Sequence, residues 1–140
     1  MKTEDQLRCE RECTRLSHHF AWCVDTLDYD GFVALFAVDG VFEGAGLQSR
    51  GHEAIRKFLD ARPANRVTRH FCTNVRIDMT GPGTATGTCM ALMYQASAAK
   101  NAPLPLPVST PMVAEYLDDY VLTDAGWKFK HRRTTVVFQS

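Results

Sequence analysis

Apolar residues in the first part of the chain recur at intervals of three and four positions, which is the spacing of one face of an α-helix. Between about Glu4 and Leu27 this face comprises Cys13, Leu16, Phe20, Cys23, Val24 and Leu27. A second, short helix is predicted over residues 29–37, with Asp28 as its N-cap and a buried side of Phe32, Leu35 and Phe36. A third helix is predicted over residues 51–62, with an apolar side of Ile55, Phe58 and Leu59.

The period changes to two in the rest of the chain, which is typical of β-strands. A short strand is expected at residues 40–46 and longer ones at 70–79, 84–95, 112–123 and 127–138. In the strand 70–79 a regular alternation places His70 on the face opposite Phe71. Residues 97–111 hold four of the six prolines, and a loop of this length is typical of a lid, a binding segment or an interface arm.

Helices followed by strands indicate an α+β domain, with three N-terminal helices packed on one face of a curved antiparallel sheet. At 140 residues we expect one domain, over residues 1–140. This arrangement leaves room for a conical, apolar pocket between sheet and helices, where a small ligand can bind.

Composition excludes several classes of function. Lys and Arg number 16, as do Asp and Glu, so no basic field favours nucleic acid. The sequence contains no run of about 18 apolar residues, which is the length that a membrane-spanning helix needs. The charged N-terminus and the odd number of five cysteines favour a reducing, cytoplasmic location. Cys9 and Cys13 have no second ligand pair at zinc spacing, so we expect no metal site.

Five segments in order give a resemblance to a known family: "VDTLDYDGFVALFAVDGVFEG", "GHEAIRKFL", "TRHFCTN", "TATGT" and "YLDDYVLTDAGWKFKHRR". Together they resemble the SnoaL-like branch of the nuclear transport factor 2 (NTF2-like) superfamily, which has a cystatin-like, conical fold. That fold hosts dehydratases, isomerases, cyclases, hydrolases and proteins without catalytic activity. The resemblance implies association into a homodimer or homotrimer through the open face of the sheet.

Scytalone dehydratase and hexachlorocyclohexane dehydrochlorinase, two members of this superfamily, pair an aspartate near the end of the first helix with a histidine in the strand after the third. Asp25 in "VDTLD" and His70 in "TRHF" match these positions. The resemblance therefore implies a catalytic dyad of His70 and Asp25, with no metal and no organic cofactor.

Other positions depart from these two relatives. Val24 stands where the dehydratase has a tyrosine, Tyr94 and Gln95 lie near its second histidine, and Ala114 and Tyr116 replace its serine and asparagine. Phe20 stands where the dehydrochlorinase has a lysine. Neither relative's substrate is therefore carried over to this chain.

A histidine oriented by an aspartate can remove a proton from a carbon next to a carbonyl group, provided that bulk water is excluded. The expected reaction is that of a lyase or isomerase, dehydratase in type, acting on a small, apolar, oxygenated ring compound. Candidate substrate-binding residues are Val24, Tyr94, Tyr116, His131 and Arg133. Tyr94, Tyr116 or Arg133 would donate a hydrogen bond to the developing enolate oxygen.

Two alternatives remain open: a polyketide cyclase, and a non-catalytic module for ligand binding or assembly. On a helical wheel Asp25 lies about 150° from the middle of the apolar stripe, which would leave it solvated, although "FAWCV" before it is apolar all round. A separation of Asp25 and His70 above about 6 Å, or a filled cavity, would argue against an enzyme. We also expect Glu115, Asp118 or Asp119 to pair with Arg132 or Arg133 across the last hairpin.

Overall fold

The structure, a computed structural model, describes residues 1–108 and 110–140. Its elements in chain order are α1 (Glu4–Asp25), α2 (Tyr29–Val33), β1 (Phe36–Gly44), β2 (Leu47–Arg50), α3 (Gly51–Asp60), β3 (Arg66–Gly81), β4 (Thr84–Ser97), β5 (Met112–Thr123) and β6 (Gly126–Phe138). The predicted loop holds neither helix nor strand over residues 98–108 and 110–111. Ser109, which belongs to that predicted loop, lies outside the described residues. The prediction of an α+β fold is confirmed.

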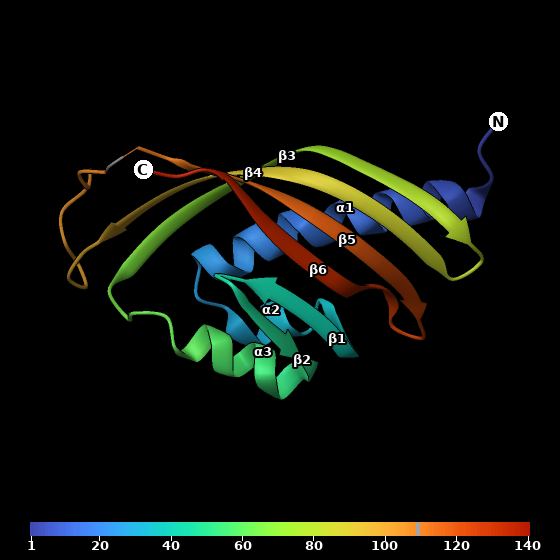
Figure 1. Ribbon diagram of the computed structural model, residues 1–140, viewed down its shortest axis with the longest axis horizontal. Coiled ribbons are helices and arrows are strands. Elements are labelled where there is room, and N and C mark those ends of the chain that lie inside the picture. Colours follow the sequence, from blue (N-terminus) through green and yellow to red (C-terminus); the bar gives the residue numbers. More distant parts are fainter. Residues whose placement is uncertain (109) are drawn as a thin grey trace.

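The strands form one six-stranded sheet in the order β2-β1-β6-β5-β4-β3. The pair β1 and β6 is parallel and the other neighbours are antiparallel, so the prediction of an antiparallel sheet is wrong at this pair. A parallel pair needs a long connection, and here most of the chain lies between its two strands. Figure 1 shows the long strands β3 to β6 curving across α1, with α2 and α3 beside β1 and β2.

The first strand begins earlier than its pattern predicted. Phe36 pairs with Phe129 of β6, whose amide donates a hydrogen bond to the Leu35 carbonyl at 2.9 Å. Because this pairing starts at Phe36, the predicted helix over residues 29–37 ends at Val33, and β2 is an additional strand that the pattern missed. The predicted N-cap of α2 is confirmed, since Asp28 accepts a hydrogen bond from the amide of Gly31 at 2.9 Å.

A bulge in β3 changes which of its side chains face the helices. The register with β4 shifts between Thr73 and Arg76. Asn74, within this segment, has a φ of 54°, a left-handed conformation that asparagine tolerates better than most residues. An extra residue reverses the alternation beyond it. The regular alternation predicted for residues 70–79 is therefore wrong after Asn74, where Val75 and Ile77 pack against the core.

A second bulge lies in β6, where the register with β5 shifts at Lys130. Phe129 before the bulge and Arg132 after it are both fully buried, although an unbroken alternation would put them on opposite faces. His131 and Arg133 consequently lie on the outer face of the sheet, away from the helices.

Aromatic rings fill the space between the helices and the sheet. The ring centroids of neighbouring pairs lie 4.6 to 6.2 Å apart in a cluster formed by Phe20, Phe32, Phe36, Phe42 and Phe129. Such separations suit tilted and edge-to-face contacts. The predicted burial of Phe32, Leu35 and Phe36 is confirmed. This cluster fixes α1 and α2 against the inner face of the sheet.

One ion pair is buried inside this core. Arg132 Nε donates to Asp118 Oδ1 at 3.0 Å, and both side chains are fully buried. The Arg132 guanidinium also lies over the ring of Tyr116, 3.8 Å from its centroid, and donates to the Ser17 hydroxyl at 2.9 Å. On the outer face, Arg133 pairs with Asp119 at 3.3 Å. The predicted pairing across the last hairpin is therefore confirmed.

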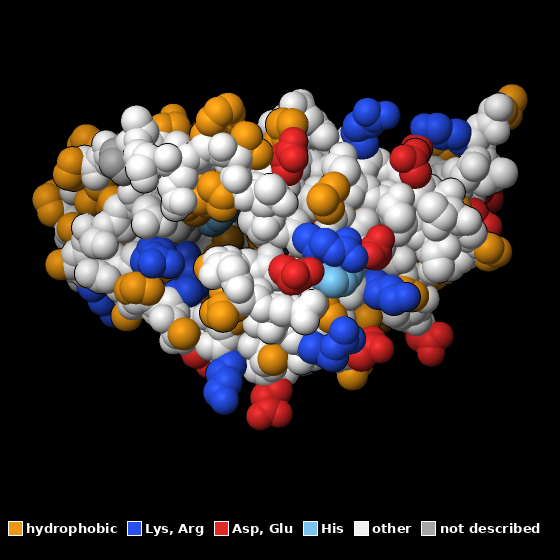
Figure 2. All heavy atoms as spheres, in the orientation of Figure 1, with side chains coloured by type: hydrophobic (Ala, Val, Ile, Leu, Met, Phe, Trp, Pro, Cys, Tyr) orange, Lys and Arg blue, Asp and Glu red, His pale blue; other side chains and the backbone are white. Residues whose placement is uncertain are grey.

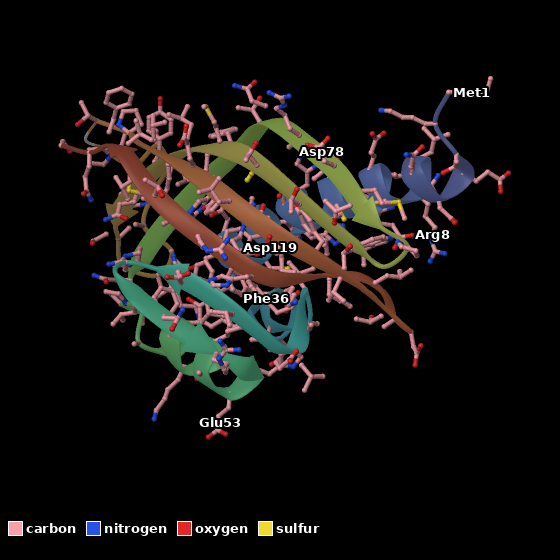
Figure 3. The ribbon with its side chains drawn as sticks, turned by 45° about the vertical axis from the view of Figure 1, so that its right-hand side comes forward. Met1, Arg8, Phe36, Glu53, Asp78 and Asp119 are labelled. Atoms are coloured by element: carbon pink, nitrogen blue, oxygen red, sulfur yellow. The ribbon has the colours of Figure 1, made fainter. Side chains whose placement is uncertain are left out.

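The outer face of the sheet carries an apolar row whose two end residues, Phe71 and Phe138, are exposed. Phe71, Leu92, Val113 and Phe138 follow one another across four paired strands, and Phe71 is 57% exposed. Figure 2 shows orange side chains gathered at the end of the molecule that holds the loop between β4 and β5. Figure 3 shows Arg8 near the start of α1, and Met1 before that helix, both remote from Glu53 in α3.

Among the described residues, no helix has both the length and the apolar character needed to cross a bilayer.

Candidate active site

Asp25 and His70 are brought together by two elements that meet at an edge of the sheet. Asp25 is the last residue of α1, and His70 lies near the start of the edge strand β3. Nδ1 of His70 lies 2.6 Å from Oδ1 of Asp25, and the His70 amide donates to Oδ2 at 2.7 Å. Each side chain is 10% exposed. The separation is well below the limit of about 6 Å set for a dyad.

This contact defines the tautomer of the histidine. An ionised carboxylate only accepts hydrogen bonds, so the ring nitrogen that faces Asp25 must carry the proton. The other nitrogen, Nε2, is then unprotonated in the neutral ring, and it can accept a proton from a bound molecule. The arrangement is that of a general base and its orienting group.

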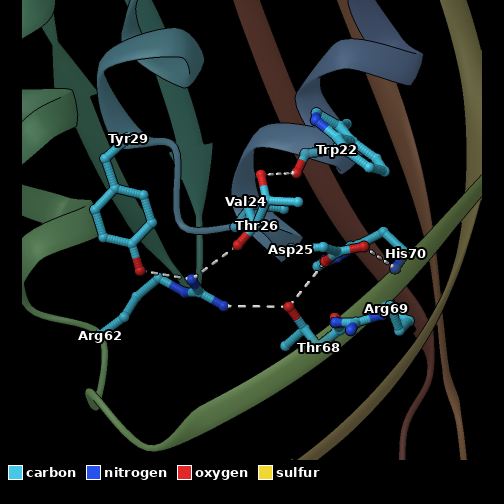
Figure 4. A network of polar contacts seen from close by, with 9 residues as sticks. All are labelled: Trp22, Val24, Asp25, Thr26, Tyr29, Arg62, Thr68, Arg69 and His70. Carbon is cyan, nitrogen blue, oxygen red and sulfur yellow. Dashed lines mark hydrogen bonds and ion pairs between the residues drawn. The ribbon is translucent and has the colours of Figure 1, made fainter.

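Thr68 and Arg62 extend this site, although the sequence reasoning selected neither. The Thr68 hydroxyl donates to Oδ1 of Asp25 at 2.9 Å. Arg62 Nη2 reaches that hydroxyl at 3.5 Å, while Nη1 donates to the Tyr29 hydroxyl at 2.7 Å. Figure 4 shows this chain of contacts from Tyr29 to His70. Thr68 stands two residues before His70 and so shares its strand face, a signal that was present in the sequence. Arg62 lies in the segment between α3 and β3 and had no comparable signal.

His70 forms part of the wall of a cavity of about 650 Å³ between the sheet and the helices. Half of the lining residues are aromatic or aliphatic, and nine polar or charged residues lie among them, a mixture that can hold a small molecule by both apolar contacts and hydrogen bonds. The lining includes aromatic and methionine side chains, which pack well against the ring of a ligand; they belong to Phe20, Phe32, Phe42, Phe58, Met93, Met112 and Tyr116. Thr110, at the end of the loop between β4 and β5, also contributes to the wall.

Two of the predicted substrate-binding residues, Val24 and Tyr116, line this cavity. Tyr94 does not, because it projects from the outer face of β4 and is 37% exposed. Its neighbours along the strand, Met93 and Gln95, line the cavity instead. Neighbouring residues of a strand face opposite sides of the sheet, so the prediction for Tyr94 was one residue away from the positions that face the cavity.

His131 and Arg133 also lie outside the cavity. Nε2 of His131 contacts the Glu43 carboxylate, and Arg133 pairs with Asp119 on the outer face. The sequence alternation had grouped both with the buried Trp127 side of β6, but the bulge at Lys130 reverses the faces beyond it. Neither residue is placed to contact a molecule bound beside His70.

Tyr116 is the tyrosine placed to act as a donor inside the cavity. Burial raises the pKa of its phenol above the ordinary value, so its hydroxyl remains protonated at neutral pH. The Arg132 guanidinium below its ring partly opposes this rise in pKa. A candidate base and a candidate hydrogen-bond donor thus line one cavity, an arrangement that suits the formation of an enolate.

The comparisons with known proteins agree with this architecture. The family model described as the SnoaL-like domain matches residues 5–133. No curated protein matches the chain.

Solved structures with 17% to 22% identity share the fold. A provisionally assigned scytalone dehydratase from Novosphingobium aromaticivorans has 22% identity and a TM-score of 0.78, with 91% of this chain and 83% of that chain covered. An NTF2-like protein with a cystatin-like fold from the same species has 19% identity and a TM-score of 0.74, covering 96% and 85%. A hexachlorocyclohexane dehydrochlorinase from Novosphingobium barchaimii has 17% identity and a TM-score of 0.75, covering 94% and 91%.

Proposed function

The chain belongs to the family of SnoaL-like domains, and we propose that it is a cofactor-free lyase or isomerase in which His70 removes a proton from a carbon next to a carbonyl group. The observation that carries this proposal is the 2.6 Å contact between Nδ1 of His70 and Asp25, at the wall of a cavity of about 650 Å³. The mixture of aromatic, aliphatic and polar residues in the lining supports a small oxygenated ring compound as the substrate.

In the dehydratase form of the reaction, Nε2 of His70 accepts the proton from carbon. The electrons of the C–H bond form a C=C bond while the C–O bond to a neighbouring hydroxyl breaks. The imidazolium then returns its proton to the leaving hydroxyl, which departs as water. In the isomerase form the same proton returns to a different carbon. Asp25 orients and stabilises the imidazolium in both forms.

We propose that Tyr116 donates a hydrogen bond to the substrate's carbonyl oxygen as negative charge develops there. Its position in the cavity lining and its protonated hydroxyl support this role. Among the three donors expected from sequence, Tyr94 and Arg133 lie outside the cavity, so Tyr116 carries this part of the proposal.

A mass-spectrometric screen of cyclic hydroxy-ketones tests the proposal. We expect a product lighter by one water, or an isomer of equal mass, from the wild type. His70→Ala should lower the turnover by about 100-fold or more. His131→Ala is the matched control, because it removes a histidine that also contacts a carboxylate but lies outside the cavity. Equal turnover by wild type and His70→Ala would remove His70 from the mechanism.

The same screen separates the alternatives. A cyclase would give a product with a new ring, which is identified by fragmentation rather than by mass alone. A binding module would retain a ketone without converting it. The proposed enzyme requires that both product formation and its dependence on His70 are observed.

A further inference from the structure

The wall of the cavity carries positive charge without a carboxylate beside it. Arg62 and Arg66 line the cavity, and no Asp or Glu is among the lining residues that the structure describes. Asp25 lies behind the wall, where its oxygens accept hydrogen bonds from His70 and Thr68. Neither guanidinium group therefore has a carboxylate partner in the described cavity wall.

Arg62 is already occupied by the protein. Its guanidinium donates to the Tyr29 hydroxyl at 2.7 Å and reaches the Thr68 hydroxyl and the Val24 carbonyl at 3.5 Å. It also lies over the Tyr29 ring, 5.8 Å from its centroid. These contacts hold Arg62 in place behind the dyad and leave it little freedom to turn toward a ligand.

Arg66 differs from Arg62 because its side chain has no hydrogen bond and no ion pair within residues 1–108 and 110–140. It is half-buried at the start of β3, opposite Ser97 of β4. Arg66, Thr68 and His70 precede the bulge, so the alternation of the strand puts all three on the cavity face. The Arg66 guanidinium is therefore free of protein partners among the described residues, and it offers a planar array of donors suited to a carboxylate.

We infer that Arg66 is a specificity-determining residue that binds a carboxylate group of the substrate. This inference rests on the proposed function for the reacting end of the cavity and adds the chemical class of its substrate. Four steps along an extended strand, each of about 3.3 Å, put the Cα atoms of Arg66 and His70 about 13 Å apart. The substrate class is therefore an apolar ring ketone whose carboxylate lies across the ring system from the carbon that loses its proton. Gln95, on the neighbouring strand, also lines the cavity and can add a neutral hydrogen bond.

Two probes of similar shape test the inference by binding alone. Naphthalene-2-carboxylate carries the anionic group, and 2-acetylnaphthalene replaces it with a neutral methyl ketone. Both are titrated into the full chain and followed by amide chemical shifts in NMR spectra. Wild type should bind the carboxylate more tightly than the ketone, and added salt should reduce this difference.

Arg66→Gln should weaken carboxylate binding about 10- to 100-fold and leave ketone binding within about twofold. Arg69→Gln is the matched control, because it removes the same charge from an exposed side chain of β3 that lies between Thr68 and His70 in sequence but on the opposite face of the strand. Ketone binding also reports whether the variant cavity is intact. Equal affinity for both probes in wild type, absence of carboxylate binding, or equal weakening by the two variants would overturn the inference.

A third variant separates this inference from the proposed function. His70→Asn removes the base while leaving Arg66 in place, so it should abolish turnover and retain the preference for the carboxylate probe. A carboxylate preference without any turnover that depends on His70 would contradict the enzyme and keep the Arg66 site. Turnover that depends on His70, with neutral and anionic probes bound equally, would contradict the Arg66 site and keep the enzyme.

Discussion

Replacing Asp25 with asparagine should disable His70 while changing a single atom of the side chain. Three donors converge on the Asp25 carboxylate: the Thr68 hydroxyl and His70 Nδ1 on Oδ1, and the His70 amide on Oδ2. Asparagine has one oxygen and one NH₂ group. If its oxygen faces the backbone amide, its NH₂ group faces Nδ1, which must then accept. The proton moves to Nε2, and the ring can no longer take a proton from a substrate.

The magnitude follows from these contacts. General-base catalysis contributes about 10²- to 10⁴-fold, and loss of the correct tautomer places the effect toward the upper end of that range. The free energy of unfolding should fall by about 1–3 kcal/mol, because hydrogen bonds to a charged group are exchanged for weaker ones or for an unsatisfied donor. In the opposite orientation of the amide, its NH₂ group and the His70 backbone N–H would be two donors facing each other at 2.7 Å, so that orientation is unfavourable.

The tautomer can be measured without a substrate, by ¹⁵N chemical shifts of the histidine rings. In wild type we expect His70 to be protonated at Nδ1, and in Asp25→Asn at Nε2. Asp28→Asn is the matched control, because Asp28 caps α2 through Gly31 and does not contact His70. An Nε2-protonated His70 in the wild type, or an unchanged tautomer in Asp25→Asn, would refute the reasoning.

Three further predictions concern other parts of the molecule. Thr68→Val keeps the shape of the side chain but removes a donor to Asp25, so it should lower turnover about tenfold and stability by about 1 kcal/mol, as measured by kinetics and urea unfolding. Arg132→Met leaves Asp118 buried without its ion partner, so the free energy of unfolding measured in urea should fall by about 3–5 kcal/mol. Adding Asp118→Leu to this variant should recover more than half of that loss. A double variant less stable than Arg132→Met alone would contradict this prediction. We propose that copies of the chain form a homodimer or homotrimer through the apolar row that includes Phe71, so Phe71→Asp should lower the mass seen by light scattering, and an unchanged mass would exclude that face.

The helices and the fold class were accessible from the sequence because their signals are local and repeated. The stripe from Cys13 to Val24 spans several turns, and Asp28 caps α2 as its residue type predicts. Face assignments in the strands were not equally accessible, because one extra residue changes every position beyond it. Lys130 gives no sign of a bulge, and this is why His131 and Arg133 were expected at the cavity.

The dyad was found through the resemblance and not through the helical wheel. The wheel places Asp25 away from the apolar stripe of α1, which describes the side of the helix that meets the aromatic core. Asp25 is instead covered by the start of β3, whose Thr68 and His70 supply its hydrogen bonds. A wheel counts apolar neighbours and gives no weight to a polar site, so it cannot identify a carboxylate that is buried among donors.

The bulge at Asn74 allows β3 to serve two purposes at once. Before it, the residues at even positions, Thr68 and His70 among them, face the cavity and the dyad. With unbroken alternation, Val75 and Ile77 would then face solvent, and the core beside α1 would lose two apolar side chains. The extra residue returns both to the inner face, where they pack against the core. The polar site and the apolar core can therefore lie on one face of one strand because Asn74 adopts a left-handed conformation between them.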